Sequence, residues 1–415
     1  MNIWIFNHYA NPPDLPGGTR HYDLARELVK RGHRVVIFAT SFHYLLFRES
    51  RLLPGEGWKT EDVNGVLFVW IRTTPYQRNN WRREWNMAEF MLKAWRLGRK
   101  LPRIAPDVGE PDVILGSSPD LLTALAACWV AYRFSVPFVM EVRDLWPQTI
   151  LDMGAMSPRH PIIITLRVLE KYLYRRAERI ITLLPLAHNY IAACGVPQKK
   201  ILWLPNGVDL SRFDQISNPG TPGTGSDLFR VMYLGAHGRA NALNVLLEAA
   251  KIIQDLNYSK IRIVLVGDGP EKPGLMDLSK RMGLKNTEFR DPVPKNSVVR
   301  TLLESDGLIL NLEDVAVFKY GISPNKVFEY MAAGKPVIFS VQAANNPVED
   351  SHCGITVPPK DPQALAEAII SLSEMSVQER EEMGLRGRKY VARHHDISVL
   401  AERLERTLEE VVHGQ

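Results

Sequence analysis

Cysteine is scarce in this sequence. Only three cysteines occur among its 415 residues, Cys128, Cys194 and Cys353, and they lie far apart along the chain. Their spacing matches neither a disulfide framework nor a cysteine-based metal site. We therefore expect the protein to reside in a reducing compartment, the cytoplasm.

Long hydrophobic runs are also missing. The most apolar window, Leu121 to Tyr132, is flanked by Asp120 and Arg133. A helix that spans a bilayer needs about 20 apolar residues, so this window predicts a buried helix instead. The first residues lack a basic segment followed by a long apolar run, and we expect no signal peptide.

Several catalytic and binding motifs are absent. The sequence has no Walker loop, no Gly-x-Ser-x-Gly motif and no Asp-x-Asp motif. It also lacks the helix-turn-helix, zinc and aromatic signatures of nucleic-acid-binding modules. We interpret His394, His395 and Asp396 as part of a solvated helical tail, not as metal ligands. We therefore expect no essential metal, no cofactor and no nucleic-acid partner.

What is present fits a large globular protein. Hydrophobic residues make up 45% and charged residues 23% of the chain, and a chain of this length is expected to form two domains of about 200 residues. Residues 1–205 carry 27 Lys and Arg against 18 Asp and Glu, a net charge of +9, whereas residues 206–415 have a net charge of −4. The basic first half is expected to meet an anionic partner.

The order of elements predicts two α/β domains. Short apolar segments bounded by turn residues alternate with amphipathic segments, which indicates βαβ units and parallel sheets covered on both faces. The pattern restarts after a turn-rich junction at 202–209 and a Gly/Pro-rich loop at 217–226. We expect two doubly wound Rossmann-like domains facing across a cleft, one of residues 1–205 and one of residues 206–394. The helical tail, residues 395–415, should pack back on the first domain.

The strongest local signal is the segment from Tyr320 to Pro336, YGISPNKVFEYMAAGKP. It predicts a loop followed by a helix from about Asn325, with Ser323 as its N-cap. The N-terminus of a helix offers free N–H groups to a phosphate, and Lys326 would add charge there. Glu329 would share a face with Lys326 and could accept hydrogen bonds from a ribose. The alternative is an ordinary capped helix with a Lys–Glu pair.

Two glycine-containing turns follow predicted strands. Gly17 and Gly18 lead into a helix that begins near Arg20, so the backbone could approach an anion closely. Gly267 stands in a second turn, where packing is the simpler explanation. Neither turn has the Gly-x-Gly-x-x-Gly spacing of a dinucleotide site.

Residues 79–103 predict a basic amphipathic helix with three tryptophans. Such a helix suits the surface of an anionic membrane. The alternative is a surface helix that buries its apolar face in the domain. If the first interpretation holds, the protein is peripheral at the inner face of the plasma membrane.

Several segments together resemble those of family 4 glycosyltransferases with the GT-B fold. They are PNGVD (205–209), LVGDGP (265–270) and SPNKVFEYMAAGKPVI (323–338). EVRDLWP (141–147) and the start of the chain resemble the WbuB-like branch, which transfers amino sugars in surface-polysaccharide assembly. The resemblance covers nearly the whole chain. It implies a retaining transfer of an N-acetylamino sugar from a UDP-sugar to a glycan or lipid-diphosphate acceptor.

The resemblance also implies roles for single residues in the second half. Glu329 is the second member of the family's pair of glutamates, but Gly321 stands where the first is expected. Arg239 matches the family's arginine for the diphosphate, and Asn241 stands near the expected lysine, for which Lys326 could compensate. Asn325 would contact the donor together with Ser323 and Gly267. Backbone groups of Pro292 and Val293 would read the nucleobase, which is uracil by family expectation.

In the first half, the resemblance places Gly18 beside the donor and Gly17, Arg20 and Arg143 on the acceptor side. Asp144 is a candidate near the reacting carbon, because Arg143-Asp144 stands where the family has a histidine. Two rival functions stay open at this point. One is a nucleotide-sugar epimerase of similar architecture, and the other is a catalytically silent subunit that binds a sugar or a partner.

Overall fold

The computed structural model describes residues 1–77, 81–215 and 228–414. The predicted loop at 217–226 and the residues Asn79 and Asn80 therefore lie outside the described residues. The chain splits into two compact units. Unit 1 contains residues 1–205, 319–323 and 397–415, and unit 2 contains residues 206–318 and 324–396.

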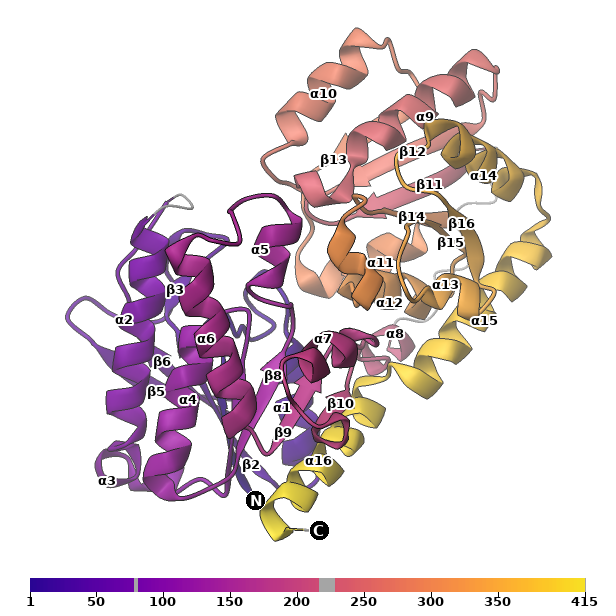
Figure 1. The fold of residues 1–415 in the computed structure, drawn as a ribbon. Helices are drawn as coiled ribbons and strands as arrows, with labels where there is room; N and C mark the ends of the chain where they lie inside the picture. Colours follow the sequence, from indigo (N-terminus) through magenta and orange to yellow (C-terminus); the bar gives the residue numbers. More distant parts are fainter. Residues whose placement is uncertain (78–80, 216–227, 415) are drawn as a thin grey trace. The chain divides into compact units, whose positions relative to one another are not determined.

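Most of unit 1 is coloured indigo to magenta in Figure 1. It is built on an eight-stranded sheet in the order β10-β9-β8-β7-β1-β2-β6-β5. Its strands are β1 (Asn2–Phe6), β2 (Arg34–Thr40), β5 (Trp58–Val63), β6 (Val66–Ile71), β7 (Val113–Ser117), β8 (Phe138–Val142), β9 (Arg179–Thr182) and β10 (Ile201–Trp203), with a separate pair, β3 (Phe42–His43) and β4 (Arg48–Glu49). The central strands are buried on both faces, which explains their continuous apolar sequences.

Helices cover both faces of this sheet. They are α1 (Arg20–Lys30), α2 (Trp81–Gly98), α3 (Leu101–Ile104), η1 (Pro106–Val108), α4 (Leu121–Phe134), α5 (Gln148–Asp152), α6 (Pro161–Arg176), α7 (Ala187–Ala193), η2 (Gln198–Lys200) and α16 (Ile397–His413). α4 packs between α2 and α6 on one face, and α1 packs against α16 on the other. The apolar window 121–132 is therefore a buried helix, as the sequence predicts.

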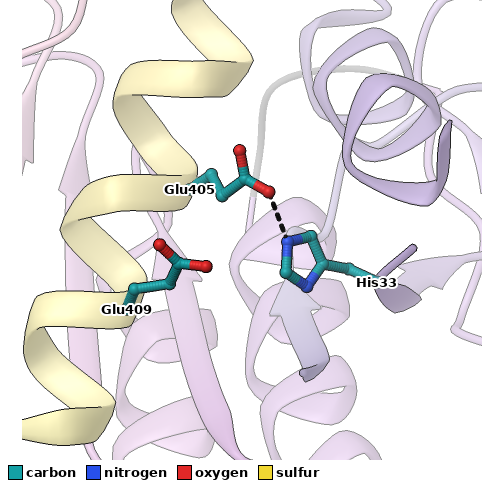
Figure 2. Close-up of side chains that lie close together, drawn as sticks. All are labelled: His33, Glu405 and Glu409. Carbon is teal, nitrogen blue, oxygen red and sulfur yellow. Dashed lines mark hydrogen bonds and ion pairs between the residues drawn. The ribbon is translucent and has the colours of Figure 1, made fainter. Parts of the chain in front are cut away.

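α16 is the element that returns to unit 1 from the end of the chain. Its side chains Leu400, Leu404 and Leu408 are almost fully buried in the core shared with α1. Figure 2 shows Glu405 of α16 pointing toward His33, with 2.7 Å between its Oε1 and His33 Nε2. The Arg31 guanidinium donates to the same carboxylate at 3.0 Å. Apolar contact and charge thus both attach α16 to the unit.

Unit 2 contains a six-stranded parallel sheet in the order β13-β12-β11-β14-β15-β16. The strands are β11 (Phe229–Leu234), β12 (Ile261–Val266), β13 (Thr287–Arg290), β14 (Gly307–Asn311), β15 (Val337–Ser340) and β16 (Gly354–Val357). Its helices are α8 (Ser211–Asp214), η3 (Arg239–Asn241), α9 (Leu243–Asp255), α10 (Lys272–Arg281), η4 (Lys295–Ser297), α11 (Val298–Leu303), α12 (Asn325–Ala332), α13 (Pro347–Asp350), α14 (Pro362–Glu374) and α15 (Val377–His394), while η5 (Ala316–Tyr320) straddles the boundary between the units. The predicted doubly wound α/β class is confirmed.

The tail differs from the prediction of a solvated helical segment at His394, His395 and Asp396. The structure ends α15 at His394 and starts α16 at Ile397. His395 between them is buried, stacks on Phe328 with 4.0 Å between ring centroids, and its Nδ1 lies 3.0 Å from the Asn206 carbonyl oxygen. The helical pattern of the sequence does not reveal this break, because the contacts that stabilise it come from distant residues.

Candidate functional site

In the sheet of unit 2, the direction in which successive strands are added reverses between β11 and β14. The chain proceeds from β11 to β12 on one side, and β14 lies on the other side of β11. In open α/β sheets, ligands bind outside the carboxyl ends of the strands at such a switch point. The loops after β11 and β14 also touch, because the Glu313 N–H donates to the Ala240 carbonyl oxygen at 3.0 Å.

Lys326 lies at this edge, in the first turn of α12. Its Nζ donates to the Tyr233 hydroxyl at 2.6 Å and to Asn241 Oδ1 at 3.0 Å. Burial lowers the pKa of Lys326 to about 8, and the nearby carboxylate of Glu329 opposes this shift. The side chain passes directly over Gly235, where a Cβ atom would lie 2.2 Å from Lys326 Cε. The structure thus brings Lys326, Glu329 and Asn241 together.

The predicted N-cap is wrong by one residue. α12 begins at Asn325, as expected, but its N-cap is Pro324, whose φ of −73° and ψ of 127° are extended. Ser323 precedes the cap, and α12 has no side-chain cap hydrogen bond. Because the ψ of Pro324 is extended and not helical, Pro324 is the cap and the first helical residue is Asn325. A role for Ser323 in donor binding stays a prediction.

The other predicted donor residues have different surroundings. Arg239 is exposed in η3, while Pro292 and Val293 lie in the loop after β13. Gly267 has a φ of +142°, and a Cβ atom there would lie 1.9 Å from the Gly235 carbonyl oxygen. This glycine is therefore required by the contact between the loops after β11 and β12, which agrees with the packing explanation.

Unit 1 has a buried charged cluster around Glu141, the penultimate residue of β8. One carboxylate oxygen accepts from Arg20 Nε at 2.9 Å, and the other lies 2.6 Å from His21 Nε2 and 2.7 Å from Ser117 Oγ. Burial opposes ionisation of Glu141, but His21 and Arg20 outweigh it and hold its pKa well below the usual range. Arg20 also donates to the Leu204 and Pro205 carbonyl oxygens. Its contacts therefore fasten α1 to the end of the sheet.

The remaining residues predicted in unit 1 lie in nearby loops. Gly17 has a φ of +119°, and a Cβ atom there would lie 2.9 Å from Asn11 Nδ2, whereas Gly18 is exposed. The Arg143 N–H donates to Ser118 Oγ at 2.8 Å, and Asp144 is exposed beside it. Their roles toward donor or acceptor stay predictions.

Two buried residues of unit 2 were missed by sequence reasoning. His237 follows β11 and Asn311 ends β14, and both are almost fully buried. A polar residue directly after an apolar strand is the signal that could have identified them, because strands of parallel sheets carry ligand-binding groups at their carboxyl ends.

One group of side chains among the described residues has the composition of a metal site. His33, Glu405 and Glu409 each offer a ligand atom within 4.8 Å of the others (Figure 2). Glu405 is already paired with Arg31 and His33, however, and Glu409 is exposed. Both units thus lack a buried, unpaired metal-ligand set in their described parts, and the expectation of no essential metal stays a prediction.

Comparisons with known proteins agree with this architecture. Residues 17–207 match the model of a glycosyl transferase 4-like domain, and residues 229–375 match that of glycosyl transferases group 1. Probable glycosyltransferase WbjE of Pseudomonas aeruginosa is 20% identical over 279 residues, 64% of this chain and 67% of that protein. Putative colanic acid biosynthesis glycosyltransferase WcaL of Escherichia coli K12 is 25% identical over 230 residues, 54% of each chain. The chain therefore matches about half of the length of WcaL.

Solved structures are similar over the full length. Sucrose-phosphate synthase from Thermosynechococcus elongatus has a TM-score of 0.73 at 17% identity and covers 100% of this chain and 99% of its own. HepE of Anabaena in complex with UDP and glucose has a TM-score of 0.67 at 16% identity and covers 99% of both chains. The chain therefore belongs to the glycosyltransferases, with a glycosyl transferase 4-like domain followed by a group 1 domain on the GT-B fold.

Proposed function

We propose that the protein is a retaining glycosyltransferase of surface-polysaccharide biosynthesis. It moves an N-acetylamino sugar from a UDP-sugar to a lipid-linked glycan or lipid-diphosphate acceptor in the cytoplasm. The name of WcaL refers to colanic acid biosynthesis, and the structure of HepE contains UDP and glucose. Both support a nucleotide-sugar donor and a polysaccharide product.

The position of Lys326 carries the proposal. When the sugar leaves the donor, negative charge develops on the diphosphate. We expect Lys326 and the N-terminus of α12 to stabilise that charge, with Arg239 in η3 as a second cation. In this proposal Glu329, one turn further along α12, accepts hydrogen bonds from the ribose hydroxyls.

Contact with a membrane is part of the proposal, because a lipid-linked acceptor must be met at a bilayer. None of the helices among the described residues is long and apolar enough to cross one. In α2, the buried side chains are Asn86, Phe90 and Ala94, whereas Trp81 and Trp85 are 70% and 55% exposed. The exposed tryptophans beside Arg82 are suited to an anionic lipid surface.

The test is to incubate the protein with UDP-N-acetylglucosamine and related donors, with and without a lipid-diphosphate acceptor. UDP release that requires the acceptor, with the anomeric configuration kept, is the expected result. Epimerised donor without acceptor would support the epimerase instead. Tight donor binding without turnover would support a silent subunit, which the glycine at position 321 keeps as the second candidate.

A further inference from the structure

Two buried polar side chains of unit 2 lack hydrogen-bond partners among the described residues. Neither ring nitrogen of His237 has a partner, and neither do the amide oxygen and nitrogen of Asn311. The exposed fractions of the two residues are 0% and 1%. A buried polar group without a partner costs about 1–3 kcal/mol, so such groups in a native protein are expected to be completed by a ligand or an ordered water.

Both residues lie at the switch point of the sheet. His237 is held by its backbone: its N–H donates to the Asp268 carbonyl oxygen at 2.8 Å, and its own carbonyl accepts from Glu271 N at 3.0 Å. A Cβ atom at Gly267 would lie 3.4 Å from His237 Nε2, so the imidazole borders the glycine turn. Asn311 is the last residue of β14, the strand beside β11.

The charges around His237 indicate an anionic ligand. Burial, Lys272 and Lys326 lower the pKa of His237 to about 4, and Asp268 opposes them. The imidazole is therefore neutral at physiological pH and has one N–H to donate. Two lysines beside a neutral donor form an environment in which a phosphoryl group gains hydrogen bonds and opposite charge together.

We propose that His237 and Asn311 are ligands of the donor diphosphate, each donating a hydrogen bond to a phosphoryl oxygen. The proposal rests on the proposed function and adds two neutral donors to the cation Lys326. Its consequence is that the diphosphate is recognised by direction as well as by charge, because an N–H group must point at the oxygen it binds.

The first experiment compares His237→Phe and Asn311→Leu with the wild type by calorimetric titration of UDP and of uridine. Phe keeps a ring and Leu keeps the side-chain volume, but both remove the polar atoms. We expect each variant to bind UDP about 10- to 100-fold more weakly. Uridine affinity should be unchanged. His237→Gln, which retains an N–H donor, should recover part of the UDP affinity.

The second readout is stability without ligand. Because the removed atoms have no partners, both variants should unfold at the same temperature as the wild type or higher, yet gain less from added UDP. Lower stability with unchanged UDP affinity would overturn the proposal and make the two residues structural. If one variant does not fold, the other still decides the matter.

A failure of the proposed function can be distinguished from a failure of the diphosphate-binding role of His237 and Asn311. If the wild type binds no uridine nucleotide, inorganic pyrophosphate is the next probe. Weaker pyrophosphate binding in His237→Phe and Asn311→Leu would then support the phosphoryl site alone. Equal pyrophosphate binding in the variants and the wild type would refute it.

Discussion

Lys326 combines a partly buried position with two neutral hydrogen-bond acceptors, Tyr233 and Asn241. Because its pKa is about 8, the ammonium loses its proton in a range where most lysines keep theirs. We predict that UDP affinity of the wild type falls as the pH rises from 7 to 9.5. The loss should approach the 10- to 100-fold expected for a hydrogen bond to a charged group.

The matched variant for this prediction is Lys326→Arg, whose guanidinium stays charged over the whole range. Its UDP affinity, measured by titration calorimetry at each pH, should change far less than that of the wild type. Parallel curves for the two proteins would contradict the assignment. Lys326→Ala should lose donor turnover at every pH while its unfolding temperature is kept.

Glu170 in α6 offers a second pH test, this time of stability. Its carboxylate is buried and accepts from the hydroxyls of Tyr174 and Tyr190 at 2.9 and 3.1 Å. Burial raises the pKa of Glu170 to about 7 from 4.5. The folded state therefore binds this proton more tightly than the unfolded state, and stability should fall by about 2–3 kcal/mol between pH 4.5 and 7.

Glu170→Gln removes the titration while its amide oxygen accepts from one tyrosine hydroxyl and its NH2 group donates to the other. Urea denaturation at pH 4.5 and pH 8 should show a larger difference in unfolding free energy for the wild type than for the variant. An identical pH dependence in both proteins would mean that Glu170 is ionised in the folded state.

How far the sequence predicts single residues depends on where their partners come from. Lys326 and Glu329 could be predicted because the helix start and their spacing are local. Tyr233 and Asn241, which bind Lys326, lie more than 80 positions away and meet it only after the sheet forms. The same applies to Arg20 of α1, whose partner Glu141 is contributed by strand β8.

At the scale of elements, the loop after β11, which contains Gly235, and the loop after β12, which contains Gly267, are in close contact. We predict that Gly267→Ala destabilises the protein by about 1–3 kcal/mol or more, because its Cβ would overlap the Gly235 carbonyl oxygen and its φ is +142°. UDP affinity should fall as well, since the loop that holds His237 must shift. Thermal unfolding and UDP titration measure the two effects.

Gly274 provides the control for this prediction. It lies in α10, and a Cβ atom there would meet nothing within 4 Å. Gly274→Ala should therefore leave stability unchanged or raise it by about 0.5–1 kcal/mol through helix propensity. If Gly267→Ala and Gly274→Ala changed stability equally, the contact between Gly267 and the Gly235 carbonyl oxygen would not require a glycine.

Most helices and strands could be predicted from apolar periodicity, but the edge of the first sheet could not. β5 pairs antiparallel with β6, and none of its residues is buried. Its sequence, WKTEDV, therefore shows no alternation of apolar and polar residues from which a strand could be predicted. The turn between them was the available signal: Asn64 and Gly65 both have positive φ, the geometry of a two-residue hairpin. The end of α15 was hidden for another reason, since its partners Phe328 and Asn206 are remote.

At the scale of the molecule, the charge difference between the halves bears on membrane contact. We predict that the protein sediments with vesicles containing anionic lipid, and that Trp81→Ser with Trp85→Ser weakens this binding. Added salt should weaken it further, because the basic half is attracted electrostatically. Tyr132→Ser is the control, since Tyr132 is 80% exposed at the last turn of α4. Full binding by the double variant would refute the role of α2.

The discontinuous make-up of unit 1 leads to a prediction about fragments. Residues 1–205 expressed alone should remain aggregation-prone or only partly folded, because the core leucines of α16 are missing and the face of α1 is left uncovered. Adding a peptide of residues 397–413 should raise the helical signal and the unfolding temperature. A stable fragment 1–205 would show that α16 is dispensable.

The return of α16 also constrains how such enzymes can be recombined. The simplest way to exchange donor specificity between relatives is a single crossover at the junction near residue 205. Here a chimera made that way would pair one parent's α1 with the other parent's α16, and His33 and Arg31 with a foreign residue at position 405. A functional exchange needs one crossover before unit 2 and one after it, so that α16 comes from the same parent as α1.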